Sequence, residues 1–459
     1  MKGYRILKVF SYIYKNLTAL SFLFIGSLLG AFLAFATQII LARELGPDRY
    51  GFFVTGLATV TLIVPLATFG LQGFWLKVFG LEGWRATRWL NPSLRFSVFT
   101  TTTTLLILIA WAFFGPHGSS FSWLLVILLP IVIGYLFIDL VSGKLQLEER
   151  YNTLALWRLM PHLLRFLFVL FVIFFVTGEY TVNTIGAAYA ITAVIIIVIG
   201  SVQLLLMLKG DFYLKGHARQ DEVTNLSEGL RPTIVKSSDI YKQSWPFALT
   251  GILYLIFFQS DVILLKYLVN DETAGIYNVA FSIMAAVYLL PNTIFQKFLL
   301  PKYHRWAEND RSHFLQVYRF SNGVILLLGI LIASLIVITM PSIIPLLFGA
   351  AYREAVDILF IIALCTPIHF LATSIGATLV TQEHMRRKVR YIGISAIINI
   401  SLNLLLIPLY GAKGAAVSTL VSEIILLVFF LFAVRRYVFG NDAWKGWNLK
   451  LKNTLRRMG

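Results

Sequence analysis

The sequence is poor in charge and has a single cysteine. Asp, Glu, Lys and Arg make up 13% of its 459 residues, about half of their share in an average soluble domain. Cys365 excludes a disulfide within the chain and any metal site made of paired cysteines, and we expect it to be a small packing residue. Phosphate-binding glycine-rich loops and paired-histidine metal spacing are also missing. We therefore expect no metal and no cofactor.

Apolar residues are abundant instead. They make up 58% of the chain, and the mean hydropathy is +0.78. Twelve apolar stretches are each about 20 to 26 residues long, and about 20 helical residues cross a bilayer core. Because backbone groups in lipid must be satisfied internally, each stretch should be a helix. The sequence predicts an all-α polytopic membrane protein with spans at 17–41, 51–75, 96–114, 121–142, 154–176, 183–208, 245–268, 275–297, 320–340, 356–380, 391–410 and 414–434.

The basic residues predict the orientation of these helices. Lys and Arg accumulate in cytoplasmic loops. With a cytoplasmic N-terminus, the predicted external loops hold only Arg43, Arg49, Arg353 and Lys413 of the 39 basic residues. Both termini are therefore predicted to be cytoplasmic, in the cytoplasmic (inner) membrane. The basic residues behind the net charge of +17 lie mainly in the predicted cytoplasmic loops, where they favour contact with anionic membrane lipids. We therefore expect no nucleic-acid partner. The first span is too long for a signal-peptide core and is kept as a helix.

An internal repeat divides the helices six and six. Residues 45–53 (LGPDRYGFF) follow the first predicted helix, and residues 269–277 (VNDETAGIY) follow the seventh, at an offset of 224. Since each half has an even number of spans, both copies keep one orientation in the membrane. We expect an N-terminal lobe over 1–208, a polar cytoplasmic linker over 209–243 and a C-terminal lobe over 244–459 with a basic tail, arranged pseudo-symmetrically around a central cavity.

Three segments carry a family resemblance: residues 41–51 (LARELGPDRYG), 345–355 (PLLFGAAYREA) and 399–416 (NISLNLLLIPLYGAKGAA). The chain resembles the polysaccharide-transport flippases, which are the O-antigen and exopolysaccharide translocases of the multidrug/oligosaccharidyl-lipid/polysaccharide exporter superfamily. The resemblance implies two six-helix lobes and the flipping of undecaprenyl-pyrophosphate-linked oligosaccharide repeat units by alternating access. It also implies polymerase and glycosyltransferase partners of the polysaccharide pathway. The glycines of these segments also have a structural interpretation, as helix ends and close packing points.

Three basic residues share one face of the fifth predicted helix. Arg158, His162 and Arg165 are spaced i, i+4 and i+7, so they extend roughly 10 Å along one face. Arg158 begins near the cytoplasmic surface and can snorkel to water. Arg165 is too deep for that and should face a wet cavity or a structural ion-pair partner. A guanidinium fork suits a pyrophosphate, which makes these residues candidate substrate ligands.

Acidic residues within helices are few. Asp261 in the seventh helix and Glu423 in the twelfth are candidates for binding protons or cations in a coupling cycle, or for neutralising a buried arginine. Asp139 lies nearer the cytoplasmic interface and is less informative.

Further candidate substrate contacts are polar residues at helical spacing or at the predicted outer rim. Two amide pairs, Asn292 with Gln296 and Asn399 with Asn403, can face sugar hydroxyls or bond neighbouring helices. Lys266 can snorkel or attract phosphate, and with Arg43 it forms an alternative anion site.

Two other functions remain open. A cation-coupled drug exporter of the same superfamily shares the twelve-helix plan. A polytopic membrane enzyme acting on lipid-linked sugars would need a larger outer loop or a carboxylate cluster, and the longest predicted outer loop has roughly 15 residues, after Met340. We therefore predict a transporter rather than an enzyme.

Overall fold

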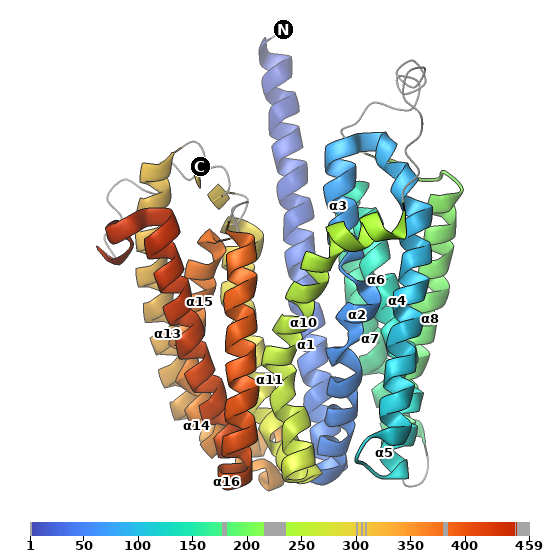
Figure 1. Ribbon diagram of the computed structural model, residues 1–459, viewed down its shortest axis with the longest axis vertical. Helices are drawn as coiled ribbons and strands as arrows, with labels where there is room; N and C mark the ends of the chain where they lie inside the picture. Colours follow the sequence, from blue (N-terminus) through green and yellow to red (C-terminus); the bar gives the residue numbers. More distant parts are fainter. Residues whose placement is uncertain are drawn as a thin grey trace. The chain divides into compact units, whose positions relative to one another are not determined.

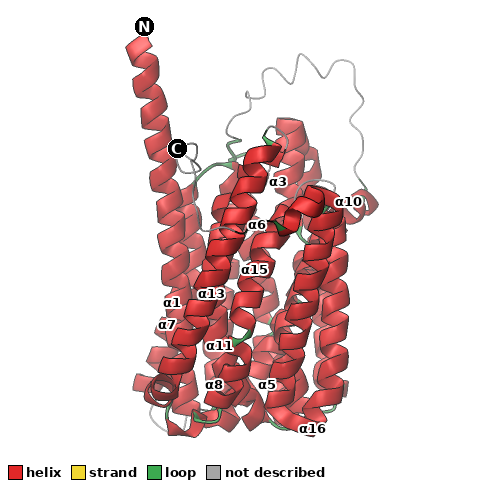
Figure 2. Cartoon of the chain, turned by 90° about the vertical axis from the view of Figure 1, so that its left-hand side faces the viewer, coloured by secondary structure: helices red, strands yellow, loops and turns green. Residues whose placement is uncertain are grey.

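The protein is all-helical wherever its structure is described. The computed structural model describes residues 2–176, 181–214, 236–299, 302–303, 306–307, 310–379, 384–445 and 447 (Figure 1). The side chains of residues 2–21 and 296–298 lie outside this description. Regular secondary structure within these ranges consists only of helices (Figure 2). The predicted all-α class is confirmed.

The helices of the first half alternate long spans with short connecting pieces. They are α1 (Lys2–Leu62), α2 (Val64–Thr68), α3 (Leu71–Glu82), η1 (Gly83–Trp89), α4 (Leu90–Phe114), α5 (Ser119–Leu128), α6 (Pro130–Leu147), α7 (Tyr151–Phe175) and α8 (Val182–Leu208). Those of the second half are α10 (Ser237–Leu268), α11 (Asp271–Asn292), η3 (Thr293–Leu299), α13 (Arg311–Phe348), η4 (Ala350–Tyr352), α14 (Ala355–Ala363), α15 (Cys365–Thr378), α16 (Met385–Val434), η5 (Arg435–Phe439) and η6 (Gly440–Trp444).

Two of these ranges each hold two spans separated by a glycine. The backbone of α1 leaves helical geometry at Gly46 (φ 71°, ψ 170°), and Pro47 then restarts the helix, as proline does at a first helical position. In α16 the break is at Gly411 (φ 58°, ψ −135°). A third span consists of α14 and α15, which are bent by 41° relative to one another. With these breaks, the described helices accommodate the twelve predicted spans.

The second predicted span differs most from the structure. Residues 51–75 were expected to form one helix, but the chain turns after α2. Phe69 (φ 45°) and Gly70 (φ 66°) are both left-handed, and α3 starts at Leu71. The Phe69 ring packs edge-on against Phe96, with ring centroids 5.1 Å apart. Since a left-handed phenylalanine is unfavourable, this packing holds a turn that hydropathy alone does not reveal.

The chain forms two compact units. Unit 1 contains residues 1–37 and 59–252, and unit 2 contains residues 38–58 and 253–459. The core of unit 1 is rich in aromatic side chains of α3 and η1, among them Phe74, Trp75 and Trp89. The segment 38–58 clusters with unit 2, although it precedes the predicted linker by more than 150 residues. The lobe boundaries expected from the sequence remain a prediction.

Large apolar side chains are exposed on nearly every long helix. Phe114 is 89% exposed, Leu346 72% and Ile338 75%. Among the described residues, eight helical runs are long and apolar enough to cross a membrane, and the bent pair of α14 and α15 adds a ninth. One run, Phe22–Phe114, overlaps three predicted spans. A soluble protein rarely leaves so much apolar surface in water. Exposed apolar surface of this extent is typical of helices in lipid, and the protein is a multi-pass membrane protein.

Candidate functional site

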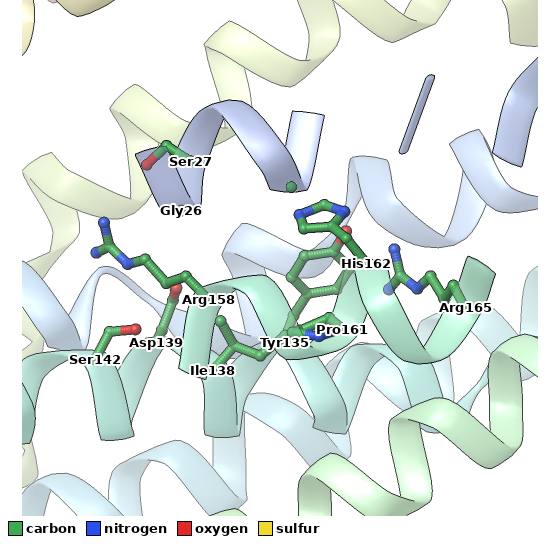
Figure 3. A pocket seen from close by; sticks show the side chains of 11 residues that line it. Gly26, Ser27, Tyr135, Ile138, Asp139, Ser142, Arg158, Pro161, His162 and Arg165 are labelled. Carbon is green, nitrogen blue, oxygen red and sulfur yellow. The ribbon is translucent and has the colours of Figure 1, made fainter. Parts of the chain in front are cut away.

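A basic cavity of about 350 Å³ lies within unit 1 (Figure 3). Helices α1, α6 and α7 line it. Its lining contains all three members of the basic stripe expected on α7, together with residues of the two neighbouring helices: Gly26, Ser27, Gly30, Tyr135, Ile138, Asp139, Ser142, Arg158, Pro161, His162 and Arg165. The structure thus brings the three basic side chains to one cavity.

Small residues on α1 let this helix approach α7 closely. A methyl group placed on Gly26 would lie 3.2 Å from the Cβ of Ala155, and one on Gly30 would lie 3.1 Å from the Cδ2 of His162. The two glycines are four residues apart, so both face the same side of α1. Because neither glycine has a side chain, His162 packs directly against α1 at the cavity wall.

Arg165 contacts the rings of two tyrosines. Its guanidinium carbon is 5.7 Å from the ring centroid of Tyr135 on α6 and 5.2 Å from that of Tyr189 on α8. Both distances are typical of cation–π contacts. Its Nε is buried and has no hydrogen-bond partner among the described residues. The side chain is therefore held in place by aromatic faces, while its hydrogen-bonding capacity is only partly used.

Arg158 has an acidic neighbour. Asp139 of α6 interacts electrostatically with Arg158 and accepts a hydrogen bond from Thr68 of α2. Figure 3 shows the Asp139 and Arg158 side chains close together at one end of the cavity, with Arg165 at the other. The two arginines thus differ: Arg158 is partly neutralised, whereas no ion pair of Arg165 occurs among the described residues.

The turn between α6 and α7 fixes where the basic helix begins. Lys144, which is 2% exposed, donates hydrogen bonds to the Gln203 carbonyl oxygen (3.2 Å) and Oε1 (3.1 Å). Its Nζ lies 3.9 Å from Glu148, which also pairs with Arg150 at 3.6 Å. Burial raises the pKa of Glu148, and the charges of Lys144 and Arg150 partly offset this. The pairs anchor the start of α7.

A second polar cluster surrounds Asp261 in unit 2. The carboxylate is 1% exposed and accepts three hydrogen bonds of 2.6 Å, from the hydroxyls of Tyr277 and Thr419 and from the Nδ2 of Asn403. Asn403 also donates to the Oδ1 of Asn399 at 3.2 Å. Helices α10, α11 and α16 meet at this carboxylate. No lysine, arginine or histidine forms an ion pair with Asp261 within the described part of the chain.

Glu423 contacts a histidine that the sequence did not single out. Its Oε1 lies 2.8 Å from the Nδ1 of His369 on α15. Both residues are buried. The alternative that Asp261 or Glu423 neutralises a buried arginine has no support, since neither forms an ion pair with an arginine among the described residues.

The other candidates lie in different places. Arg43 donates from Nη1 to the Leu346 carbonyl oxygen at 3.4 Å. Lys266 pairs with Asp271 at 2.5 Å and lies 4.7 Å from the Phe52 ring centroid. Asn292 is the last residue of α11 and is half-buried, and the side chain of Gln296 lies outside the described ones. Asn399 and Asn403 also bond Ser260 and Asp261 of α10, and sugar contact by either amide pair remains a prediction.

Sequence reasoning missed the partners of the predicted residues: Tyr135, Tyr189, His369, Tyr277 and Thr419. Their separation along the chain explains this. Thr419 is 158 residues from Asp261 and Glu423 is 54 from His369, so no periodicity links them. One usable signal was present, because Gly26 and Gly30 at a four-residue spacing predict a close helix contact.

The two clusters differ in the chemistry that they permit. The cavity of unit 1 offers guanidinium and imidazole donors, which suit an anion such as a phosphate. The cluster of unit 2 offers carboxylate, amide and hydroxyl oxygens, which suit a hard cation or a proton. Within the described ranges, no group of three or more His, Cys, Asp or Glu side chains is placed to hold a metal ion.

Comparisons with known proteins agree with the predicted fold and family. The chain is 22% identical over 411 residues to a probable low-salt glycan biosynthesis flippase, Agl15, of Haloferax volcanii, covering 87% of this chain and 79% of that protein. Its fold is similar to the inward closed conformation of the lipid II flippase MurJ, with a TM-score of 0.68, 14% identity and coverage of 90% and 87%.

The fold is also similar to an inward-facing multidrug resistance transporter of the MATE family in the MOP superfamily. The TM-score is 0.63 at 13% identity, and the match covers 88% of this chain and 94% of the other. The model of one family, described as polysaccharide biosynthesis protein, matches residues 17–305. Because this match spans more than half of the sequence, the chain belongs to the polysaccharide biosynthesis protein family.

Proposed function

We propose that the protein is a flippase that moves undecaprenyl-pyrophosphate-linked oligosaccharide repeat units across the cytoplasmic membrane for surface polysaccharide synthesis. Membership of the polysaccharide biosynthesis family and the glycan flippase among its relatives support this function. The observation that carries it is the position of Arg165, which lines the cavity and whose buried Nε has no hydrogen-bond partner among the described residues.

Arg165 suits the pyrophosphate of a lipid carrier. Aromatic rings hold its side chain, so little rotamer freedom is lost when it binds an anion. A planar guanidinium donates two parallel hydrogen bonds to adjacent phosphate oxygens. Arg158 and His162 extend the basic stripe toward the end of the helix where a cytoplasmic substrate would enter. In this proposal Arg165 is the principal contact to the pyrophosphate. Arg158 is a weaker contact, because its charge is partly neutralised by Asp139.

Asp261 is the proposed ion-coupling residue. A carboxylate within a membrane protein and without a basic partner is costly unless a proton or cation neutralises it. The Oδ1 of Asn403 is buried and unpartnered in the described structure, next to the Asp261 carboxylate. The two residues together supply oxygen ligands for a monovalent cation. Binding and release of that ion would drive the conformational cycle.

The cycle proposed is alternating access between the two lobes, with both chain termini on the cytoplasmic side. The segment 38–58 supplies a gate in this scheme. Within unit 2, the Tyr352 hydroxyl donates to the Ala42 carbonyl oxygen at 2.8 Å, and Asn278 donates to the Tyr50 hydroxyl at 2.8 Å. These contacts involve the ends of helices that the loop charges predict to be external. Their separation would release the substrate to the outer leaflet. Polymerase and glycosyltransferase partners of the polysaccharide pathway are part of the same proposal.

Reconstitution tests the proposed function directly. The full-length protein is placed in proteoliposomes with fluorescent undecaprenyl-pyrophosphate-linked oligosaccharide, and a membrane-impermeant quencher reports which leaflet holds the label. We expect the label in the inner leaflet to become accessible at a rate that depends on protein. A rate equal to that of protein-free liposomes would contradict the flippase function. Movement of a cationic drug in place of the lipid would favour the exporter alternative.

A further inference from the structure

His369 and Glu423 form an enclosed pair within unit 2, apart from the Asp261 carboxylate. His369 is 8% exposed and Glu423 1%. The Tyr288 ring of α11 stacks on the imidazole, with centroids 3.9 Å apart and planes at 20°, and Phe258 of α10 meets its edge at 5.9 Å. Side chains of four helices, α10, α11, α15 and α16, thus surround the pair.

The pair is incompletely hydrogen-bonded. The Nε2 of His369, the Oε2 of Glu423 and the hydroxyl of Tyr288 are all buried, and none has a hydrogen-bond partner among the described residues. A buried polar atom without a partner in the protein is unfavourable. A purely structural ion pair in a protein interior is stabilised when its remaining atoms are satisfied. Three such unsatisfied atoms at one place leave free donors and lone pairs, which is the capacity that a proton-binding site needs.

The local charge is also unbalanced. Besides His369, the titratable groups that interact electrostatically with Glu423 in the described part of the chain include Tyr254 of α10, Tyr288 of α11 and Cys365 of α15. Cys365 also interacts with Asp261. Neither carboxylate forms an ion pair with a lysine or arginine in the described part of the chain. One imidazole can neutralise only one of the two carboxylates. The second needs an additional positive charge, because the membrane interior disfavours net charge.

We propose that His369 and Glu423 form a proton-binding site that takes up and releases one proton in each transport cycle, in addition to the ion that Asp261 binds. The proton comes from bulk water and returns to it, and it is shared between the Nδ1 of His369 and the Oε1 of Glu423. No other bond forms or breaks. This inference rests on the proposed transport function and assigns its second coupling ion.

Infrared difference spectroscopy tests the site without any substrate. Full-length protein is titrated with acid, and the carboxyl and imidazolium bands are followed. We expect a titrating band in the parental protein that Glu423→Gln and His369→Gln each remove. Asp261→Asn and the control Glu354→Gln, an exposed carboxylate of the same unit, should retain it. An unchanged band in Glu423→Gln, or no titrating band in the parental protein, would overturn the proposal.

Transport provides the second readout. In proteoliposomes with an imposed pH gradient, the parental flipping rate should differ from its rate without a gradient. Glu423→Gln should remove that difference, whereas Glu354→Gln should preserve it. If parental protein flips no lipid but its band titrates as expected, the flippase function fails and the proton site stands. If it flips lipid and Glu423→Gln responds to the gradient as the parent does, the proton site fails and the flippase function stands.

Discussion

Gly51 and Gly275 occupy equivalent positions of the internal repeat, 224 residues apart, and pack directly against each other within unit 2. A methyl group on Gly51 would lie 2.8 Å from the backbone nitrogen of Gly275, and one on Gly275 would lie 2.9 Å from the backbone nitrogen of Gly51. The carbonyl oxygens of Asp271 and Pro47 would also clash with these methyl groups. Only glycine permits backbones to approach so closely.

We predict that Gly51→Ala destabilises the protein, because the new methyl group meets rigid backbone. Overpacking of this kind costs about 1–3 kcal/mol. Thermal unfolding of the purified protein measures this loss of stability. Gly80→Ala is the matched control, since a methyl group on Gly80 meets nothing within 4 Å. It should be neutral or stabilise by about 0.5–1 kcal/mol. Equal melting temperatures for Gly51→Ala and the parent would show that this contact can relax freely.

The gate contact between Tyr50 and Asn278 can be tested by crosslinking. The Asn278 amide donates to the Tyr50 hydroxyl at 2.8 Å. We expect Tyr50→Cys with Asn278→Cys, joined by a short bifunctional thiol reagent, to stop flipping because the outer ends can no longer separate. Each single cysteine variant with the same reagent is the control. The natural Cys365 is buried and should not react. Undiminished flipping by the fully crosslinked protein would rule out this segment as a gate.

Ion coupling at Asp261 predicts a cation-dependent stability. An ion that binds only the folded state stabilises it by about 2.7 kcal/mol at a hundredfold excess over its dissociation constant. Parental protein should therefore melt at a higher temperature as sodium replaces a large organic cation. Asp261→Asn keeps the shape but removes the charge, and its melting temperature should not respond. Asp357→Asn, an exposed carboxylate paired with Lys413, should respond as the parent does. Sodium sensitivity in Asp261→Asn would place the ion elsewhere.

The sequence was sufficient to predict the all-helical fold, and the described helices are consistent with the predicted number of spans. The length of a hydrophobic stretch and the charge of a loop are local properties, so both can be read from the sequence without knowledge of the tertiary structure. The turn at Phe69 was missed because it depends on packing against Phe96, and the mixed membership of unit 2 was missed because segment 38–58 joins it only through long-range contacts. Gly46, by contrast, was correctly expected to end a helix.

The candidate site was predicted in part. Periodicity identified the stripe of Arg158, His162 and Arg165, since all three belong to one helix. It could not identify Tyr189, which reaches Arg165 from α8, or His369, which meets Glu423 from another helix. Contacts of this kind depend on how helices pack, and that information is distributed over many small and large side chains.

The central claim is that Arg165 binds the anionic group of the lipid carrier during flipping, and its substitution in the proteoliposome assay tests this most directly. Hydrogen bonds to charged groups contribute about 1.5–3 kcal/mol, so Arg165→Ala should slow flipping at least about tenfold while the protein stays folded. Arg165→Lys should be partly active, because it keeps the charge but loses the guanidinium fork. Arg85→Ala, at an exposed arginine, should flip at the parental rate. A parental rate for Arg165→Ala would contradict the account and make Arg165 a structural residue.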